Sequence, residues 1–487
     1  MADYDFDIGI IGGGAAGLTA ASGASQLGAR TLLIEKEKRL GGDCLHYGCV
    51  PSKTLIKSAK VYHLLKNSEK YGLPSIDVPP VRYRDIVNRI KNVIDVIQEH
   101  DSEKRFCSMG VRIMYGEPFF VDPFTIDLEG KKITSKKWVI ATGSSQGIPP
   151  LEGIYDASYI TNREIFYMDE LPRSVAVLGA GPIAVEMAQA LNRLGCSVSI
   201  IQRSGQILSK EDRDMADSVM EVLSQEGVKF CLDSSVSRLK KSGSNAEIFI
   251  KNKNGEECKI TAEKVLIALG RVPNIKGLKL ENAGVEYNEK GVPVDNRMRT
   301  SARHIYAAGD VTGKYQFTHA AGYEGSIVLS NAVVRLPRKA DYTFLPWCTY
   351  TDPEFAGIGL NERNAAAEGI KYSVWTEEFK NNDRSLAEGE ETGRIKMILD
   401  ERERPVGVQI FGPGAGDLIG EWVAVLNSRM KLSGLASSMH PYPSFCEINK
   451  KVAGNFLAPK IFSEKVKKGL KLFFHLKGRA CEPDEHG

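Results

Sequence analysis

This chain has no long hydrophobic segment: nowhere does it approach the ~20 consecutive apolar residues that a membrane-spanning helix needs. Its N-terminal stretch, MADYDFDIGIIGGG, carries acidic residues where a signal peptide would be basic. It also lacks an excess of one charge, because 64 Lys and Arg oppose 61 Asp and Glu, giving a net charge of +3 at pH 7. These absences argue against membrane-spanning, exported and nucleic-acid-binding proteins, and a cytoplasmic protein is expected.

Cysteine is too scarce for a disulfide scaffold, with nine residues in a chain of 487, so most thiols are expected to be reduced. A disulfide in such a chain is expected to be catalytic rather than structural. The eight histidines are scattered along the chain, and no metal site is predicted. With 26% charged and 42% hydrophobic residues, the composition is that of a globular protein with about two to four domains.

The most informative stretch present is GGDCLHYGCVPSK at Gly41–Lys53. Cys44 and Cys49 follow a Gly-Gly turn and are separated by four residues, which would let the two thiols face each other across one helical turn as a redox-active disulfide. Cys44 lies near a predicted helix N-terminus, where the helix dipole favours a thiolate. The alternatives are two buried structural cysteines or half of a metal site, but no second pair follows to complete a zinc site.

A βαβ pattern typical of dinucleotide binding begins the chain. Strands are predicted at Asp7–Ile11 and Arg30–Ile34, with a helix at Leu18–Leu27 between them. The turn before the helix is Gly12-Gly13-Gly14-Ala15-Ala16-Gly17. The pattern assigns these roles: Gly12 makes the tight turn, Gly14 lets a pyrophosphate approach the backbone, Gly17 allows close helix–strand packing, and Glu35 bonds a ribose hydroxyl.

The same pattern recurs later in the chain. Strands are predicted at Ser174–Leu178 and Ser197–Ile201, with a helix ending at Leu194. The turn reads Gly179-Ala180-Gly181-Pro182-Ile183-Ala184, with Ala184 in place of the third glycine. The acidic position is taken by Gln202, which does not repel a 2′-phosphate, and the adjacent Arg203 could pair with one. NADPH is therefore allowed and favoured over NADH, unless Arg203 only points to solvent.

Two such patterns predict two bound dinucleotides. The cysteine pair begins nine residues after Glu35, which indicates that the first nucleotide is a flavin with the dithiol beneath its ring. The second site would then bind the mobile nicotinamide cofactor.

Together with further motifs, these stretches give the chain a strong resemblance to a known family. The motifs are VIATGSS (Val139–Ser145), IALGRVPN (Ile267–Asn274), IYAAGDVTG (Ile305–Gly313), TDPEFAGIGL (Thr351–Leu360) and PYPSFCEINK (Pro441–Lys450). Over roughly residues 4–460 the chain resembles the pyridine nucleotide–disulfide oxidoreductases, the family of dihydrolipoamide dehydrogenase, glutathione reductase and mercuric reductase.

The resemblance implies roles for individual residues. Cys49 would be the thiol stacked on the flavin of FAD, and Cys44 the interchange thiol that meets the substrate. Lys53 would lie near the flavin and pair with Glu186, although an ordinary ion pair is the alternative. Asp310 would hold the ribityl and pyrophosphate region. Further FAD contacts are implied for Lys36, Gly42, Asp43, Gly116, Ala141, Thr142, Gly143, Gly309, Thr318 and His319. Gly270, with Gly179, Gly181, Ile183 and Ala184, is implied for the nicotinamide nucleotide.

The resemblance also implies an α/β architecture of two Rossmann-like domains and a C-terminal α+β dimerisation domain. The FAD domain would comprise residues 1–148 and 275–337, interrupted by the NAD(P) domain at 149–274. Residues 338–460 would form the interface domain, a mixed sheet with helices. A homodimer is expected, because in relatives this domain completes the site of the partner subunit.

One position near the C-terminus bears on the chemistry. Dithiol-reacting members carry a His-Pro pair followed by a Glu, in which the imidazole moves the thiol proton. Anchoring on Pro443 and Glu447 puts Tyr442 at the base position, as in mercuric reductases. A phenol, with an ordinary pKa of ~10, is a poor base near neutrality, but it suits a site where thiolates bind a soft metal. Aligning on His440 instead would need a two-residue insertion.

The likeness to mercuric reductases is incomplete. The chain has no N-terminal GMTCxxC domain, and its C-terminal stretch RACEPDEHG contains the single Cys481. Cys446 and Cys348 are candidates to replace the missing delivery pair, and the alternative is that both are small buried hydrophobic residues.

The expected function is therefore an FAD- and NAD(P)H-dependent reductase of a disulfide or a thiol-bound metal. A dihydrolipoamide dehydrogenase and a flavoprotein redox sensor with little turnover are the alternatives. The tail 461–487 contains a basic amphipathic segment that would either lie on an anionic membrane or dock on the protein itself, and its last residues, EPDEHG, are expected to be disordered.

Overall fold

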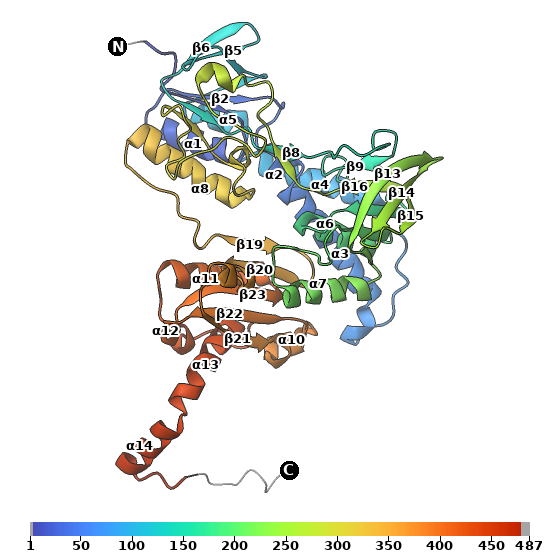
Figure 1. The fold of residues 1–487 in the computed structure, drawn as a ribbon, viewed down its shortest axis with the longest axis vertical. Coiled ribbons are helices and arrows are strands. Elements are labelled where there is room, and N and C mark those ends of the chain that lie inside the picture. The colour runs from blue at the N-terminus through green and yellow to red at the C-terminus, as the bar shows by residue number, and fades with distance from the viewer. Residues whose placement is uncertain (1–2, 479–487) are drawn as a thin grey trace. The chain divides into compact units, whose positions relative to one another are not determined.

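The computed structural model describes residues 3–478, and the chain divides into two compact units, Met1–Thr343 and Phe344–Gly487 (Figure 1). Cys481 and the stretch 482–487, for which disorder is predicted, lie outside the described residues. Among residues 3–478, no helix combines the length and the apolar character needed to cross a membrane.

The first unit contains a five-stranded parallel sheet in the order β18-β7-β1-β2-β3. Its strands are β1 (Ile8–Ile11), β2 (Thr31–Glu35), β3 (Val111–Tyr115), β7 (Trp138–Ile140) and β18 (Ile305–Ala307). Every residue of β1 and β2 is buried, as in parallel sheets that are covered on both faces. Helices α1 (Ala15–Gln26) and α8 (Thr318–Leu329) pack closely, because Gly325 has no Cβ. A Cβ at this position would lie 2.6 Å from the Ala16 carbonyl oxygen.

The first predicted βαβ unit is confirmed with shifted boundaries. Its strands differ by one residue from the prediction, whereas the helix begins at Ala15 rather than Leu18. Gly14 is the N-cap and no side chain caps the helix, so the motif's alanines already belong to the first helical turn. The backbone N–H groups of that turn therefore lie inside the motif.

A second five-stranded parallel sheet has the order β12-β11-β10-β16-β9. Its strands are β9 (Tyr159–Ile160), β10 (Ser174–Leu178), β11 (Ser197–Ile201), β12 (Lys229–Cys231) and β16 (Lys264–Ile267). Helices α6 (Pro182–Arg193) and α7 (Arg213–Gln225) belong to the same region. The two strands predicted around the second glycine turn are confirmed residue for residue.

Three small antiparallel sheets complete the strands of this unit. They are β4-β5-β6 (Phe119–Phe120, Thr125–Leu128, Lys131–Thr134), β13-β14-β15 (Ser234–Ser242, Asn245–Asn252, Glu257–Ala262) and β17-β8 (Arg271–Pro273, Ser144–Gln146). The last pair matters for the site, since it joins the VIATGSS and IALGRVPN motifs, with Ser144 opposite Pro273.

Helices follow the first βαβ unit. They are α2 (Gly42–His46), α3 (Cys49–Lys66), α4 (Tyr83–Gln98) and α5 (Glu103–Ser108), with a 3-10 turn η1 (Ser68–Tyr71). Helix α3 packs against both α4 and α6. In α4 the buried residues Tyr83, Val87, Ile90 and Ile94 recur at helical spacing, which places one apolar face toward the core. Other short turns of this unit are η2 (Leu280–Ala283), η3 (Asp310–Thr312) and η4 (Ser330–Val334).

The second unit is built on one antiparallel sheet in the order β19-β20-β23-β22-β21. Its strands are β19 (Pro346–Thr349), β20 (Glu354–Gly359), β21 (Tyr372–Glu378), β22 (Arg394–Asp400) and β23 (Pro405–Gly412). The mixed sheet expected for this domain is therefore wrong. No long crossover connects neighbouring strands in parallel: β22 and β23 are joined by a short turn, and the other neighbours also run antiparallel.

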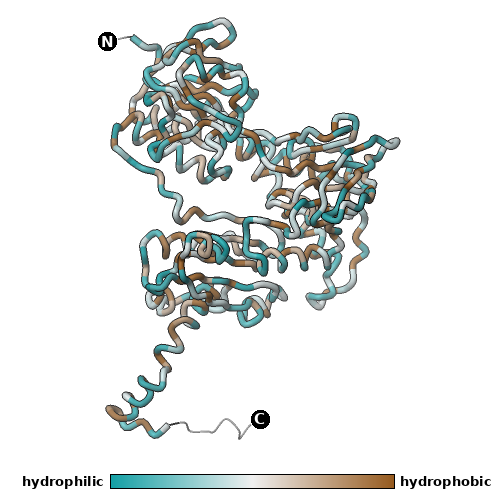
Figure 2. The backbone as a smooth tube through the Cα atoms, in the orientation of Figure 1, coloured by the Kyte–Doolittle hydropathy of each residue, from teal (hydrophilic) through white to brown (hydrophobic). Residues whose placement is uncertain are grey.

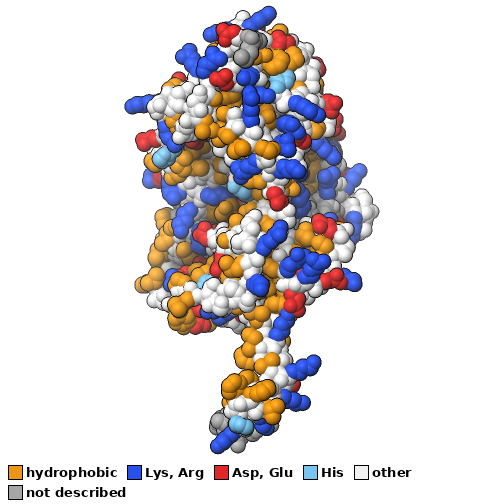
Figure 3. Space-filling model, turned by 90° about the vertical axis from the view of Figure 1, so that its left-hand side faces the viewer, with side chains coloured by type: hydrophobic (Ala, Val, Ile, Leu, Met, Phe, Trp, Pro, Cys, Tyr) orange, Lys and Arg blue, Asp and Glu red, His pale blue; other side chains and the backbone are white. Residues whose placement is uncertain are grey.

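Helices α11 (Ala415–Asn427), α12 (Leu432–Ser437) and α13 (Glu447–Ile461) supply the apolar residues that pack on this sheet around the fully buried Trp422. Shorter elements are α9 (Glu362–Ala367), η5 (Phe379–Asn381) and α10 (Asp383–Glu388). The tube in Figure 2 shows apolar segments along these strands and helices. The final helix, α14 (Glu464–Phe474), has no buried residue, and Figure 3 shows apolar and lysine side chains exposed on the terminal helices.

The predicted fold class is confirmed: the chain is α/β, with two Rossmann-like parallel sheets and a separate C-terminal unit of strands and helices. That unit begins at Phe344. The finer division of the first unit into an interrupted FAD domain and an NAD(P) domain stays a prediction.

Candidate active site

The two cysteines of the GGDCLHYGCVPSK stretch lie on successive helices. Cys44 is in the short α2 and half-buried, whereas Cys49 is exposed and is the first residue of the 18-residue α3. The chain turns between them at Tyr47 and Gly48, and a Cβ on Gly48 would lie 3.0 Å from the Asp43 carbonyl oxygen. The turn brings the two side chains into hydrogen-bonding contact as free thiols.

The environment assigns different protonation states to these thiols. The hydrogen bond from Cys44 lowers the pKa of Cys49 to about 6, helped by the Thr318 hydroxyl and the charge of Lys53, and opposed by partial desolvation of the sulfur and by Glu186. The same hydrogen bond, together with burial, raises the pKa of Cys44. Cys49 is thus the thiolate and Cys44 keeps its proton. The dipole of the long helix α3 also acts at Cys49, not at Cys44 as the sequence suggested.

Lys53 connects this thiolate to the neighbouring glycine-turn helix. It lies one turn after Cys49 on α3, and its Nζ is 2.8 Å from Oε2 of Glu186 on α6. Glu186 is only 4% exposed. A buried carboxylate needs a cation, so this pair keeps an ammonium group close to Cys49. Thr318, the first residue of α8, also contacts Cys49, with Oγ1 3.3 Å from Sγ.

The first glycine turn has the backbone geometry that its motif requires. Gly12 has φ +112°, and a Cβ there would lie 2.2 Å from the Ala141 carbonyl oxygen. A Cβ on Gly17 would lie 1.9 Å from the Gly12 carbonyl oxygen. Glu35 ends β2, and its Oε2 accepts a hydrogen bond from the Gly13 N–H at 2.7 Å. These contacts leave a bare backbone turn at the N-terminus of α1.

The redox segment packs directly on this turn. A Cβ on Gly42 would lie 2.8 Å from the Gly14 Cα, and the Gly41 N–H donates to the Gly13 carbonyl at 2.9 Å. The remaining residues predicted to contact FAD are spread around the same sheet edge. Gly116 follows β3, Ala141–Gly143 follow β7, Gly309 and Asp310 follow β18, and Lys36 follows β2. His319 lies beside Thr318 and stacks on Phe317, with ring centroids 5.3 Å apart.

A half-buried polar network, which the sequence did not reveal, joins three of these segments. Arg271 is 2.8 Å from Asp43 and donates from Nε to the Ser144 hydroxyl at 2.7 Å. That hydroxyl donates to Asp310 Oδ2 at 2.5 Å. Burial raises the pKa of Asp310, although Ser144 and Arg271 oppose the shift. Arg271 and Ser144 both belong to motifs quoted above, and their presence in those motifs was the signal that could have found them.

The second glycine turn repeats the geometry of the first. Gly179 has φ +103°, and a Cβ there would lie 2.5 Å from the Ala268 carbonyl oxygen. Gly181 is the N-cap of α6, with no side-chain cap and Pro182 in the first turn. Ala184 is fully buried, Ile183 is exposed, and Gly270 has φ +115°. At the end of β11, Gln202 donates to the Ser204 hydroxyl at 2.7 Å while Arg203 is exposed.

In the second unit, the structure places the two candidate bases in different surroundings. Tyr442 is 72% exposed and its hydroxyl donates to Asp383 Oδ2 at 2.7 Å; this hydrogen bond raises the pKa of the phenol. The His440 side chain is only 8% exposed, with Nε2 2.9 Å from Glu421 Oε1. Glu447, the predicted partner of Tyr442, accepts instead from the Ser444 N–H at 3.4 Å.

The two cysteines considered for metal delivery both pack against the core of the second unit. Cys348 and Cys446 are half-buried. The Ser444 hydroxyl lies 3.0 Å from the Cys446 sulfur. This packing favours the alternative in which both cysteines serve as small hydrophobic residues.

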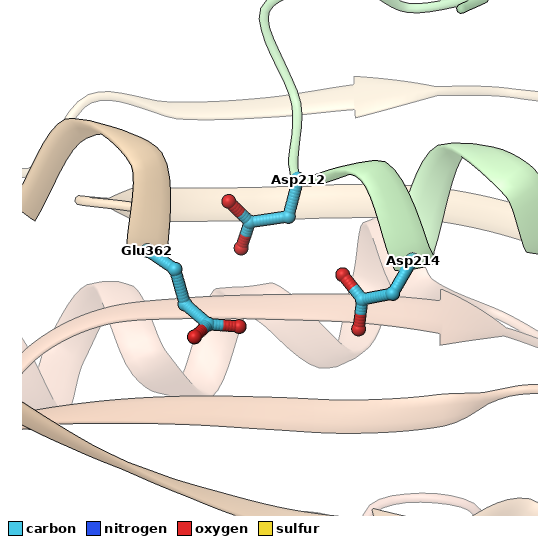
Figure 4. Close-up of side chains that lie close together, drawn as sticks. All are labelled: Asp212, Asp214 and Glu362. Atoms are coloured by element: carbon cyan, nitrogen blue, oxygen red, sulfur yellow. The ribbon is translucent and has the colours of Figure 1, made fainter. Parts of the chain in front are cut away.

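Three further acidic side chains begin helices and are not assigned to the site (Figure 4). Asp212 precedes α7 and Asp214 lies in its first turn, while Glu362 is the first residue of α9 and pairs with Lys396 Nζ at 2.6 Å. Carboxylates at helix N-termini complement the helix dipole, which accounts for the positions of all three.

Comparison with known proteins decides the family. The model of the pyridine nucleotide-disulphide oxidoreductases matches residues 6–325, and the model of the dimerisation domain of that family matches residues 345–453. The chain belongs to this family. The resemblance in its motifs is therefore confirmed, as are the expectations of a flavin disulfide reductase and of FAD and NAD(P)H as cofactors.

Relatives in the family have different activities. A mercuric reductase of Staphylococcus aureus is 33% identical over 464 residues, covering 93% of this chain and 83% of the relative. A dihydrolipoyl dehydrogenase of Bacillus subtilis is 32% identical over 460 residues, covering 91% of this chain and 96% of the relative. The solved Cu(II) complex of RclA, an HOCl-induced flavoprotein disulfide reductase of Escherichia coli, has a TM-score of 0.83 at 26% identity. The match covers 92% of this chain and 99% of the RclA chain.

The residues of the first turn fit the FAD that the family uses. The uncapped N-terminus of α1 presents backbone N–H groups for a pyrophosphate. Only glycine fits at Gly12 and Gly17, and Gly14 is free of near contacts apart from Gly42, so a nucleotide can approach the backbone there. The match to the dimerisation domain supports a homodimer.

The low pKa of Cys49 gives a direct prediction for the reduced enzyme. With a pKa of about 6, the thiolate fraction rises about tenfold between pH 5 and pH 7 and is then nearly complete, whereas an ordinary thiol, with a pKa of ~8.5, keeps rising. Thiolate absorbance near 240 nm should therefore show a step centred near pH 6. The Cys49→Ser variant should lack this step; its persistence there would assign the low pKa to another cysteine.

Proposed function

We propose that this enzyme uses NAD(P)H to reduce a small disulfide or a thiol-bound soft metal ion at Cys44 and Cys49. The observation that supports the proposal is that the two thiols differ in protonation: Cys49 is held as a thiolate near Lys53, and Cys44 keeps its proton. Bound FAD supplies the two-electron relay between the nicotinamide and the sulfur pair. The nicotinamide nucleotide is proposed to bind at Gly179, Gly181, Ile183, Ala184 and Gly270.

In the proposed exchange with a disulfide acceptor, Cys44 and Cys49 react one after the other. Cys44 loses its proton and attacks one acceptor sulfur, which forms a mixed disulfide and releases the first acceptor thiolate. The Cys49 thiolate then attacks the Cys44 sulfur, which re-forms the Cys44–Cys49 disulfide and releases the second thiolate. One departing thiolate takes the proton that Cys44 released, and the other takes a proton from Tyr442, which solvent restores. For a soft metal ion the two sulfurs serve as ligands instead.

The preference for reduction over dithiol oxidation rests on Tyr442. Its hydrogen bond to Asp383 raises the phenol pKa, so near neutrality this group keeps its proton and cannot act as a base. A departing thiolate needs a donor of this kind, whereas oxidation of a dithiol needs a base. We propose that Tyr442 is the proton donor, and that Glu447 orients its segment through Ser444.

A second candidate function, dihydrolipoamide oxidation, is favoured by one observation. His440 and Glu421 form an imidazole–carboxylate pair at 2.9 Å, the arrangement that holds a histidine base in one orientation. The burial of the His440 side chain, 8% exposed, argues that the pair is structural. A flavoprotein sensor remains the third candidate and would show negligible turnover with every acceptor.

These candidates separate in one assay with a matched substitution. NADPH oxidation is measured with mercuric ion, lipoamide, glutathione disulfide and a quinone, and dihydrolipoamide oxidation is measured in reverse. The Tyr442→His variant should raise the dihydrolipoamide rate at least about tenfold, because it supplies a base of suitable pKa. His440→Gln should leave that rate unchanged within about twofold. A large loss in His440→Gln would instead make His440 the base and support the second candidate.

We propose that NADPH is preferred over NADH through Arg203. Its guanidinium is exposed at the end of β11, beside Gln202, where a carboxylate would have repelled a 2′-phosphate. Arg203→Ala should raise the KM for NADPH by about tenfold, as expected for one lost arginine–phosphate pair, and leave the KM for NADH unchanged. The matched control is Arg173→Ala, an exposed arginine before β10 at the opposite end of the same sheet. Equal effects on both nucleotides would contradict the proposal.

The remaining assignments are also proposals. FAD is proposed to contact the first glycine turn, Glu35, the residues around the sheet edge described above, and Lys53. The FAD domain is proposed to comprise residues 1–148 and 275–337 and the NAD(P) domain residues 149–274. A cytoplasmic homodimer is proposed, in which the Tyr442 segment of each subunit serves the site of the other.

A further inference from the structure

The C-terminal helix α14 exposes an apolar face that its own unit does not cover. Val466, Leu470, Phe473 and Phe474 recur at positions i, i+4, i+7 and i+8, which places them on one side of an α-helix. Their exposed fractions range from 39% for Val466 to 77% for Phe473. Phe462, just before the helix, and Leu476, just after it, are exposed as well. Large aromatic side chains left in water at this density mark a binding surface.

The opposite side of α14 is strongly basic. Lys467, Lys468 and Lys471 lie there with Glu464, the only acidic residue of the helix. Glu464 pairs with Lys467 at 2.8 Å, so positive charge remains in excess. Lys465 borders the same side, and Lys477 follows the helix.

We propose that α14 binds the surface of an anionic lipid bilayer. A helix with a narrow apolar face and a lysine-rich polar face lies in the plane of the interface, with the apolar side chains among the acyl chains and the lysines at the anionic headgroups. Ser463, whose hydroxyl accepts from the Val466 N–H, starts the helix independently of α13. The enzyme thus carries its own attachment segment outside the dimerisation-domain match, which ends at residue 453.

The charge pattern favours lipid over a second copy of this chain. Two α14 helices packed through their apolar faces would turn their lysines outward, so the excess positive charge of each helix would stay without a counter-charge. A nucleic acid would neutralise the lysines but leave both phenylalanines in water. An anionic surface with an apolar interior satisfies both sides of the helix.

The test uses the full FAD-loaded enzyme and sedimentation with lipid vesicles. Vesicles of phosphatidylcholine with about one quarter phosphatidylglycerol should bind the enzyme, and vesicles of phosphatidylcholine alone should bind it much more weakly. Raising the salt from about 0.1 M to about 1 M shortens the screening length from ~10 Å to ~3 Å and should weaken binding. Lys467→Gln/Lys468→Gln/Lys471→Gln should reduce the affinity on the order of 100-fold, at about fivefold per lysine.

The helix offers a matched pair of substitutions for its apolar face. Leu472 is nearly as exposed as Phe473 but lies four residues after Lys468, on the basic side. Phe473→Ser should weaken vesicle binding at least about tenfold, the cost of one lost buried aromatic ring, and Leu472→Ser by less than about threefold. NADPH oxidation should be unchanged in both variants, which shows that the enzyme is folded.

Three outcomes would overturn the proposal. The first is an absence of binding to anionic vesicles by the full enzyme. The second is an equal loss of binding in Phe473→Ser and Leu472→Ser. The third is a drop in the molar mass of Phe473→Ser by light scattering in lipid-free buffer, because it would show that a second copy of the chain covers this face.

Discussion

Cys44→Ser should lower NADPH-dependent reduction of disulfide acceptors by at least about 1,000-fold while leaving the flavin bound. A serine hydroxyl cannot form a disulfide with Cys49, so both steps of the proposed exchange are lost. The magnitude follows from the loss of a covalent nucleophile, which leaves only the residual contributions of binding and orientation. Turnover and the visible flavin spectrum per chain are the two measurements.

The same variant should keep the Cys49 thiolate. A serine hydroxyl can still donate a hydrogen bond to Cys49, and Lys53 and Thr318 remain in place. The thiolate step near pH 6 should therefore survive in Cys44→Ser, although it disappears in Cys49→Ser. This contrast separates the roles of two cysteines that a loss of turnover alone cannot distinguish.

The matched control is Cys107→Ser. Cys107 is an exposed free cysteine on α5 and has no place in the proposed exchange, so turnover should be unchanged. If Cys44→Ser kept more than about a tenth of the wild-type rate with disulfide acceptors, another thiol would be the reductant and the proposed function would fail.

The sequence predicted those parts of the site that depend on local backbone chemistry. The strands Ser174–Leu178 and Ser197–Ile201 were predicted residue for residue, because short apolar runs flank a glycine turn with little freedom of register. The first glycine turn was also placed correctly, although its helix begins earlier than the apolar pattern indicated. A helix start that is set by a backbone turn, without a capping side chain, is hard to locate from the sequence.

Contacts between distant segments could not be predicted in this way. The hydrogen bond from Ser144 to Asp310 joins residues 166 positions apart, and that from Tyr442 to Asp383 spans 59 positions. The identity of the thiolate depended on a similar detail, the turn at Gly48 that ends α2 and starts α3 at Cys49. Spacing alone placed both sulfurs on one turn but did not reveal which of them begins the long helix.

The exposed face of α14 shows another limit. The alternation of lysine with Leu and Phe predicts an amphipathic segment, but sequence alone does not say whether its apolar side is covered. In the structure the last described helix buries none of its residues. The sequence left two alternatives for this segment, docking on the protein itself or binding to an anionic membrane, and the exposure of the whole helix favours the membrane.

Gly12→Ala should yield a chain that no longer holds FAD, or that does not fold stably. The added Cβ would lie 2.2 Å from the Ala141 carbonyl oxygen, a backbone atom of the segment following β7, and φ is +112° at this position. Neither strand can move aside, because β1 and β7 are central neighbours in the parallel sheet. The expected cost is about 4 kcal/mol or more, in the range of severe core disruptions.

Gly28→Ala provides the matched control, because it separates the backbone strain from the clash. Gly28 also has positive φ, +85°, but nothing lies within 4 Å of a Cβ built there. Its substitution should cost only about 1 kcal/mol, the ordinary penalty of a left-handed backbone. Flavin absorbance per chain and the unfolding temperature should be nearly those of the wild type in Gly28→Ala and strongly reduced in Gly12→Ala. Similar behaviour of the two variants would mean that the turn at Gly12 yields to a side chain, and so does not fix the backbone against which FAD is proposed to bind.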